Sequence, residues 1–124
     1  MGDISKHFSR SEFACKCGCG FDTVDAKLLR DLEQVREALY DPHTEEDYWI
    51  RINSGCRCPE YNESIGGSKK SQHLYGRAAD FVVADTDPRD VYEFCEDVIE
   101  PGGLGNYETF THMDSRTGHA RWEG

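Results

Sequence analysis

The sequence predicts an α+β domain in which helices flank a small, mainly antiparallel sheet. Helical and strand-like segments follow one another in the order helix, strand, helix, strand, helix, strand, strand, and the last two have the close spacing of a hairpin. The chain has 124 residues, which is enough for one domain with a modest core but not for two. We therefore expect residues 1–124 to form a single domain, with residues 1–22 as a cysteine-rich N-terminal segment.

The clearest helix is predicted at residues 25–40. Thr23 or Asp25 can cap its first turn, and Asp41-Pro42 stops it. Its apolar residues recur with helical period and are expected to face the core as one stripe. They are Leu28, Leu29, Leu32, Val35 and Leu39.

Flanking segments complete the first half of the chain. Phe8 and Phe13 are expected to anchor residues 4–14 to the core. Residues 41–47 form an acidic loop, and residues 48–53 alternate enough to predict a half-buried strand that ends in a turn.

The second half begins with a short helix at Pro59 and a polar loop at residues 66–71. A strand starts near Asp80 and runs to Ala84, and Thr86 is the expected N-cap of a second long helix. The buried stripe of that helix predicts that its cysteine is a core thiol. The stripe consists of Val91, Phe94, Cys95, Val98 and Ile99.

The C-terminal part is predicted to complete the sheet. Pro101-Gly-Gly ends the second helix, and residues 104–107 lead into a strand at residues 109–114. After a turn, residues 119–122 are expected to form a final edge strand.

Charge and hydropathy exclude several classes of protein. Acidic residues outnumber basic ones by 24 to 14, for a net charge of -10, which argues against a nucleic-acid binder. No segment approaches the roughly 20 apolar residues of a membrane span, so we expect no membrane insertion. The N-terminus lacks the apolar core of a secretory signal, so synthesis in the cytoplasm is expected. We also expect a monomer.

Two histidines and an aspartate form a candidate metal site. His73 and Asp80 lie seven residues apart, which suits a loop that leads into a strand, with Gly76 at the turn. His112 offers a third donor from another strand-like segment. Imidazole nitrogen and carboxylate oxygen are usual zinc donors, and three of them plus a water make an open, catalytic kind of site. On spacing alone, the first pair also suits a surface histidine and a capping aspartate.

Five further cysteines form a second candidate cluster. Three lie within five residues of a glycine-rich loop, and two more lie close to the predicted short helix. The set is a structural metal site, a disulfide arrangement or a group of free thiols, and the spacing leaves these alternatives open. The residues are Cys15, Cys17, Cys19, Cys56 and Cys58.

Several motifs together resemble the M15 family of zinc D-alanyl-D-alanine peptidases, in particular the small peptidases of phages, prophages and bacteria. The resemblance covers about residues 7 to 122 and implies the fold shared with the hedgehog signalling domain. The motifs are Ser11-Glu-Phe-x-Cys-x-Cys-Gly-Cys-Gly20, Ser54-Gly-Cys-Arg57, Ser71-x-His73-x-x-Gly76-x-Ala78-x-Asp80 and Phe110-x-His112-x-Asp114.

The resemblance implies a role for each matching residue. The zinc ligands would be His73, Asp80 and His112. Arg57 would hold a substrate carbonyl or carboxylate, because its guanidinium is always charged. Ser71 would bond the substrate or cap the ligand loop.

The general base departs from the pattern of many relatives, which carry glutamate three residues before the last zinc histidine. Here that position is Thr109. Glu108, Asp114 and Tyr107 remain candidates. Glu108 would share the face of His112 in a regular strand. Asp114 would act as a base or orient a ligand, and the tyrosine would donate a proton or hydrogen bond to the oxyanion.

These inferences predict a Zn²⁺ peptidase that cuts peptide bonds in the stem peptides of bacterial peptidoglycan. It would be a D-Ala-D-Ala carboxypeptidase or a murein endopeptidase, related to phage lysis enzymes, and would act on the cell wall if released. Two alternatives stay open. One is a catalytically inactive, zinc-containing binding module of the same fold, and the other is a small domain built around zinc held by cysteines.

Overall fold

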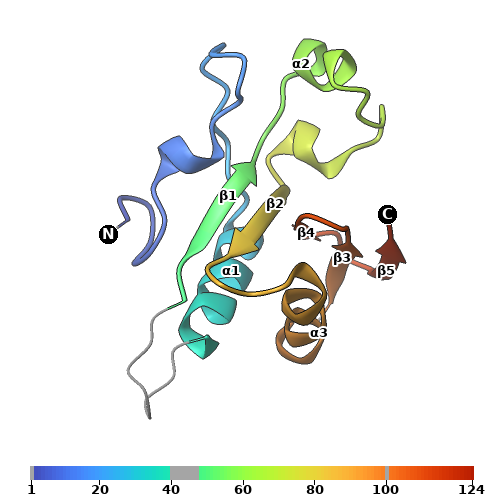
Figure 1. The fold of residues 1–124 in the computed structure, drawn as a ribbon. Coiled ribbons are helices and arrows are strands. Elements are labelled where there is room, and N and C mark those ends of the chain that lie inside the picture. The colour runs from blue at the N-terminus through green and yellow to red at the C-terminus, as the bar shows by residue number, and fades with distance from the viewer. Residues whose placement is uncertain (1, 40–47, 100) are drawn as a thin grey trace.

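The computed structural model describes residues 2–39, 48–99 and 101–124 and confirms the α+β class (Figure 1). The helices are η1 (Arg10–Phe13), α1 (Ala26–Ala38), α2 (Pro59–Ser64), η2 (Gln72–Tyr75) and α3 (Pro88–Val98). The strands are β1 (Ile50–Ser54), β2 (Ala78–Val83), β3 (Gly102–Asn106), β4 (Thr111–Asp114) and β5 (His119–Glu123). No helix among these described residues is long and apolar enough to cross a membrane.

The five strands form one sheet in the order β1-β2-β4-β3-β5. Neighbouring strands are antiparallel except for the parallel pair of β3 and β5. Figure 1 shows α1 and α3 near one end of the β1–β2 pair, with α2 and η2 near the other end. The functional side chains described below come from this second end and from the strands beside it.

Helix α1 turns its predicted stripe toward the hydrophobic core that it shares with the sheet strands. Asp25 is its N-cap and accepts hydrogen bonds from the backbone N–H groups of Lys27 and Leu28. Phe8 and Phe13 are buried in the same core, as predicted. The predicted helix end at Tyr40 and the acidic loop at residues 41–47 lie outside the described residues.

Helix α3 differs from the prediction at its first turn. Asp87, rather than Thr86, caps it by accepting a hydrogen bond from the Arg89 N–H. The threonine hydroxyl instead donates to the carbonyl oxygen of Ala84 and is therefore engaged in the preceding turn. Cys95 is fully buried in the core, as predicted.

The main difference lies in β3, a strand that the sequence does not predict. Glycine has low strand propensity, so Gly102-Gly103-Leu104-Gly105 resembles a loop. The structure nevertheless places this segment between β4 and β5. The final strand is an edge strand as predicted, but it pairs with β3 in parallel instead of forming a hairpin with β4.

Strand β4 is shorter than predicted because the chain reverses before it. The backbone N–H of Tyr107 donates to the carbonyl oxygen of Phe110 across a turn. The strand therefore begins at Thr111 rather than Thr109. As a result, strand periodicity does not extend back to Glu108.

Successive side chains of β2 point to opposite faces of the sheet, and only one of these faces is covered by the apolar core. Ala79, Phe81 and Val83 point into the core, so Asp80 lies on the opposite face of the sheet. Its direct cross-strand partner in β4 is His112. The sheet register thus places a carboxylate beside an imidazole, away from the apolar core.

Glu33 on α1 ties the N-terminal segment to the domain, and it generates the first prediction. Its carboxylate lies 2.6 Å from His7 Nδ1, accepts the His7 backbone N–H at 2.7 Å and also accepts the Ser5 hydroxyl. Burial raises the pKa of Glu33, but these hydrogen bonds outweigh burial and lower it. We expect Glu33→Gln to reduce the free energy of unfolding by about 1–2 kcal/mol at neutral pH.

This difference should depend on pH. A lowered carboxyl pKa stabilises the fold above the unfolded pKa of about 4.3, and that contribution is lost as pH falls through the folded pKa. Urea unfolding at pH 7 and at about pH 3 checks this. Glu37→Gln, on the exposed part of α1, is the matched control and should change stability by less than about 0.5 kcal/mol. Equal deficits at both pH values would contradict the assignment.

Candidate metal centre

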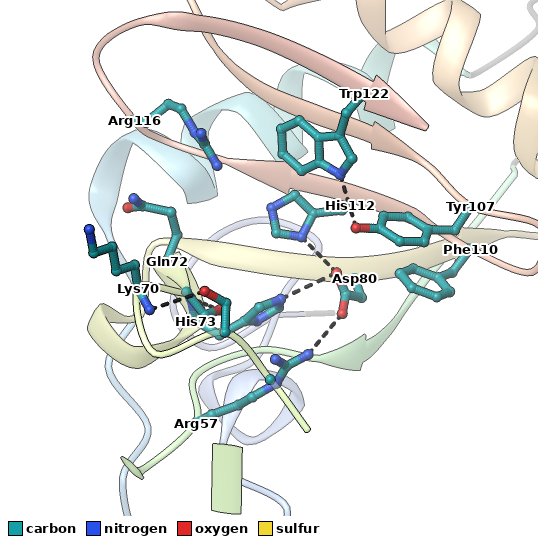
Figure 2. Close-up of a pocket in the computed structure, with 13 residues that line it drawn as sticks. Arg57, Lys70, Gln72, His73, Asp80, Tyr107, Phe110, His112, Arg116 and Trp122 are labelled. Carbon is teal, nitrogen blue, oxygen red and sulfur yellow. Dashed lines mark hydrogen bonds and ion pairs between the residues drawn. The ribbon is translucent and has the colours of Figure 1, made fainter. Parts of the chain in front are cut away.

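Three buried side chains converge where η2, β2 and β4 meet. His73, Asp80 and His112 each offer one nitrogen or oxygen atom, and these atoms all lie within 4.8 Å of one another. Figure 2 shows the two rings and the carboxylate pointing toward a common centre. The structure therefore brings together the three residues that the sequence singles out.

The loop before β2 fixes the first ring. Ser71 is the N-cap of η2, and its hydroxyl accepts the backbone N–H of His73 at 3.2 Å. Gly76 ends η2 with a left-handed φ of 67°, which favours glycine. The ring then lies with Nδ1 2.6 Å from the carbonyl oxygen of Gly55.

This contact decides which ring nitrogen faces the centre. A carbonyl oxygen can only accept, so Nδ1 of His73 carries the hydrogen. In a neutral ring Nε2 is then an acceptor, and it is buried without a hydrogen-bond partner among the described residues. It lies 3.3 Å from Oδ1 of Asp80, which is also an acceptor. A cation between them would remove the repulsion between two acceptors this close, so the site fits a metal ion.

His112 lies between two carboxylates. Its Nδ1 is 2.9 Å from Oδ1 of Asp80, and its Nε2 is 2.9 Å from Oδ2 of Asp114. Burial lowers the pKa of His112, but the two carboxylates outweigh burial and raise it. Burial likewise raises the pKa of Asp80, yet the hydrogen bond and the charge of His112 outweigh burial and hold it well below its usual range.

Asp114 lies behind His112 and is fully buried. It accepts hydrogen bonds from the Gly103 N–H and from the backbone and guanidinium of Arg116. Burial raises the pKa of Asp114, but His112 and Arg116 outweigh burial and keep it far below the ordinary value. A carboxylate so fully engaged is placed to orient the imidazole and is poorly placed to take up a proton.

The three donors face a cleft of about 330 Å³. Figure 2 shows Lys70, Gln72 and Arg116 on one side of it and Tyr107 and Phe110 on the other. Among the described residues that line it, Asp80 is the single carboxylate. The complete lining is Arg57, Gly67, Ser68, Lys70, Ser71, Gln72, His73, Asp80, Tyr107, Phe110, His112, Arg116 and Trp122.

Arg57 lines this cleft and contacts one of the metal donors, Asp80. Its guanidinium donates to Oδ2 of Asp80 at 3.1 Å, to Asn62 Oδ1 at 3.2 Å and to Ser54 Oγ at 3.2 Å. A guanidinium has five N–H groups, so these three bonds leave two.

The residues proposed as a base fall in different places. Tyr107 lines the cleft, and its hydroxyl oxygen accepts the indole N–H of Trp122 at 2.9 Å. Glu108 is exposed and lines another hollow with Asp87 and Arg89. The turn before β4 therefore directs the glutamate away from the metal donors.

Several residues that line the cleft were not predicted from the sequence, among them Arg116 and Trp122. Arg116 follows Asp114 by two residues, and this short spacing could have indicated that the two side chains are paired. Trp122 offers no such signal, because only the parallel pairing of β5 with β3 brings it to the cleft. Its ring centroid lies 5.2 Å from that of His112 and 5.0 Å from the guanidinium carbon of Arg116.

The cysteines separate into a cluster and two isolated thiols. Four of them have sulfur atoms that all lie within 4.8 Å of one another, and these are Cys15, Cys17, Cys19 and Cys58. Cys56 is apart from them, and its thiol donates to the carbonyl oxygens of Phe13 and Phe21. All six cysteines are free thiols in the structure.

The position of Asp114 generates a prediction about metal affinity. Asp114→Asn should weaken metal binding about 10–100-fold, because the imidazole loses the charged acceptor that orients it. Competition with a chelator measures the affinity. Asp97→Asn, at an exposed position of α3, is the control and should leave the affinity unchanged. Equal affinities for both variants would show that the carboxylate does not orient the ring.

Comparison with known proteins agrees with this geometry. A family model described as Peptidase M15 matches residues 6–114. No curated protein matches the chain. The matched range covers most of the chain and includes all three metal-donor residues together with Arg57 and Asp114. The chain therefore belongs to the Peptidase M15 family, as its motifs indicate.

Proposed function

We propose that this peptidase is a zinc enzyme that hydrolyses peptide bonds in the stem peptides of bacterial peptidoglycan, as a D-Ala-D-Ala carboxypeptidase or a murein endopeptidase. The observation that carries the proposal is the unpartnered, buried Nε2 of His73 directed at the Asp80 carboxylate beside His112. Membership of the Peptidase M15 family supports the same chemistry.

The donor set suits Zn²⁺. Two imidazole nitrogens and one carboxylate oxygen form a catalytic kind of zinc site, whereas calcium and magnesium prefer oxygen ligands alone. A zinc ion held there supplies Lewis acidity, which polarises a carbonyl and makes water nucleophilic near neutral pH. His73, Asp80 and His112 would hold it, with Asp114 orienting the last ring.

The charges around the cleft support an anionic peptide as substrate. The whole chain has a net charge of -10, yet the cleft lining includes three cations. Arg57 and Arg116 are paired with Asp80 and Asp114, and Lys70 has no ion pair among the described residues, so the local balance is positive. A stem peptide that ends in a carboxylate matches this local excess of positive charge. Arg57 would bind the carboxylate or the scissile carbonyl with the two N–H groups left by its internal bonds.

Tyr107 is the proposed oxyanion donor. Because the Trp122 N–H already donates to the tyrosine oxygen, the hydroxyl hydrogen is left to point at another acceptor. Because the tyrosine lines the cleft, that hydrogen would be available to a bound peptide. A donor aimed at the developing negative charge stabilises the transition state more than the substrate.

The principal test removes one metal donor. His73→Ala should abolish metal binding at the centre and hydrolysis of purified peptidoglycan together, because it deletes the unpartnered nitrogen. Mass spectrometry of the released fragments identifies the bond that is cut. His119→Ala, at an exposed position of β5, is the matched control and should retain metal and activity.

Circular dichroism of the His73→Ala variant checks that a loss of activity is not a loss of fold. A folded variant that still degrades peptidoglycan at the wild-type rate would refute the proposal.

A separate pair of variants tests the assignment of Tyr107. Tyr107→Phe should lower kcat about 10²–10³-fold, the usual effect of removing one oxyanion donor. Glu108→Gln should leave kcat within about twofold, because the glutamate faces another hollow. Steady-state kinetics on a defined stem peptide measures both. The reverse ranking would assign the catalytic role to the glutamate.

One observation favours a second function, a zinc-containing binding module without turnover. The described cleft lining has no carboxylate free of the metal donors to act as a base. Calorimetric titration with muropeptides, combined with a turnover assay and a metal count, separates the two functions. Bound zinc and bound muropeptide without hydrolysis would support the module, and hydrolysis would exclude it.

A further inference from the structure

We propose that Cys15, Cys17, Cys19 and Cys58 bind a second zinc ion, which has a structural role and is independent of the centre at His73. The four residues are named here as the thiolate cluster. They come from the glycine-rich loop after η1 and from the residue that caps α2, so they are far apart in sequence.

The sulfur geometry supports one shared ion. The Cys17 sulfur lies 3.5 Å from that of Cys15 and 3.6 Å from that of Cys58, and the remaining sulfur atom lies within 4.8 Å of all three. A zinc–sulfur distance of about 2.3 Å gives a tetrahedron with edges of about 3.8 Å. A disulfide would need about 2.05 Å. The observed separations therefore match four ligands around one ion.

The loop is shaped to bring alternate residues together. Gly18 and Gly20 have φ values of 81° and 92°, which residues other than glycine rarely adopt. The carbonyl oxygens of Cys15 and Phe21 accept the backbone N–H groups of Gly18 and Cys15, respectively. The chain thus folds back on itself and directs three thiols to one point.

Backbone N–H groups donate to two of the four sulfur atoms, as they do to thiolate ligands of a metal. The N–H of Cys58 donates to the Cys15 sulfur at 3.4 Å, and the N–H of Tyr61 donates to the Cys58 sulfur at 3.4 Å. Such hydrogen bonds orient metal ligands and reduce their negative charge.

The loop has little else to hold it. Residues 16–20 are all exposed, so burial of apolar surface contributes almost nothing there. An ion bound by all four thiolates would cross-link this loop to the start of α2. It would also fix the residue next to Arg57, whose guanidinium contacts Asp80.

The experiment counts metal in the full chain under reducing conditions. Wild-type protein purified with zinc should carry two ions per chain. The double variant Cys17→Ser/Cys19→Ser should carry one, and its melting temperature should be lower. Both positions are exposed, so the core should still form. Combining this variant with His73→Ala should leave no zinc.

Cys56→Ser is the matched control. It lies two residues before Cys58 in the sequence, and a serine hydroxyl can still donate to one of the two carbonyl oxygens. It should keep both ions. Loading with cobalt alone gives a second readout, since thiolate–cobalt bonds absorb in the near ultraviolet and the double variant should lose this band.

Two results would overturn the proposal. One is an unchanged zinc count in Cys17→Ser/Cys19→Ser. The other is an intact mass, under the same reducing conditions, that shows disulfide bonds among the four cysteines. Neither result would bear on the proposed peptidase, because its metal count and activity are tested through His73.

Discussion

The site depends on one buried carboxylate. Asp80 accepts a hydrogen bond from Arg57 through one oxygen, and its other oxygen lies within 3.3 Å of a nitrogen from each of two imidazoles. A buried charge is stable only when it is paired. Each partner comes from a different element, so the carboxylate determines how β2, β4, η2 and the segment before α2 must meet.

This constraint explains the glycines of β3, which sequence propensity assigns to a loop. Gly103 is paired with Asp114, and a Cβ there would lie 2.5 Å from its carboxylate oxygens. A Cβ on Gly105 would lie 2.6 Å from the indole nitrogen of Trp122. The glycines of β3 leave space for the Asp114 carboxylate and the Trp122 indole, which both contact His112. A local propensity rule fails here because tertiary contacts at the site outweigh it.

Sequence patterns predict structure over short stretches of the chain, but they do not predict which distant strands pair. Helix α1 and the trio of metal donors follow from periodicity and from a short motif, and the structure brings all three donors together. Glu108 shows the limit, because its predicted place on the face of His112 assumes a strand where the chain turns. Trp122 reaches the cleft through a parallel pairing that no local pattern encodes. Long-range pairing, rather than residue type, carries the missing information.

Four consecutive residues connect the two candidate metal sites. The Gly55 carbonyl orients the first imidazole, the Arg57 guanidinium binds Asp80, and Cys58 belongs to the thiolate cluster. A Cβ on Gly55 would lie 2.5 Å from the Phe13 backbone, so this segment packs directly on the N-terminal segment.

Because these contacts lie within four residues, we expect a shift of the cysteine loop to move Arg57 and the Gly55 carbonyl oxygen as well. Positioning errors near 1 Å matter for a catalytic group. The N-terminal segment therefore packs on residues that position the cleft, although none of its described residues lines the cleft.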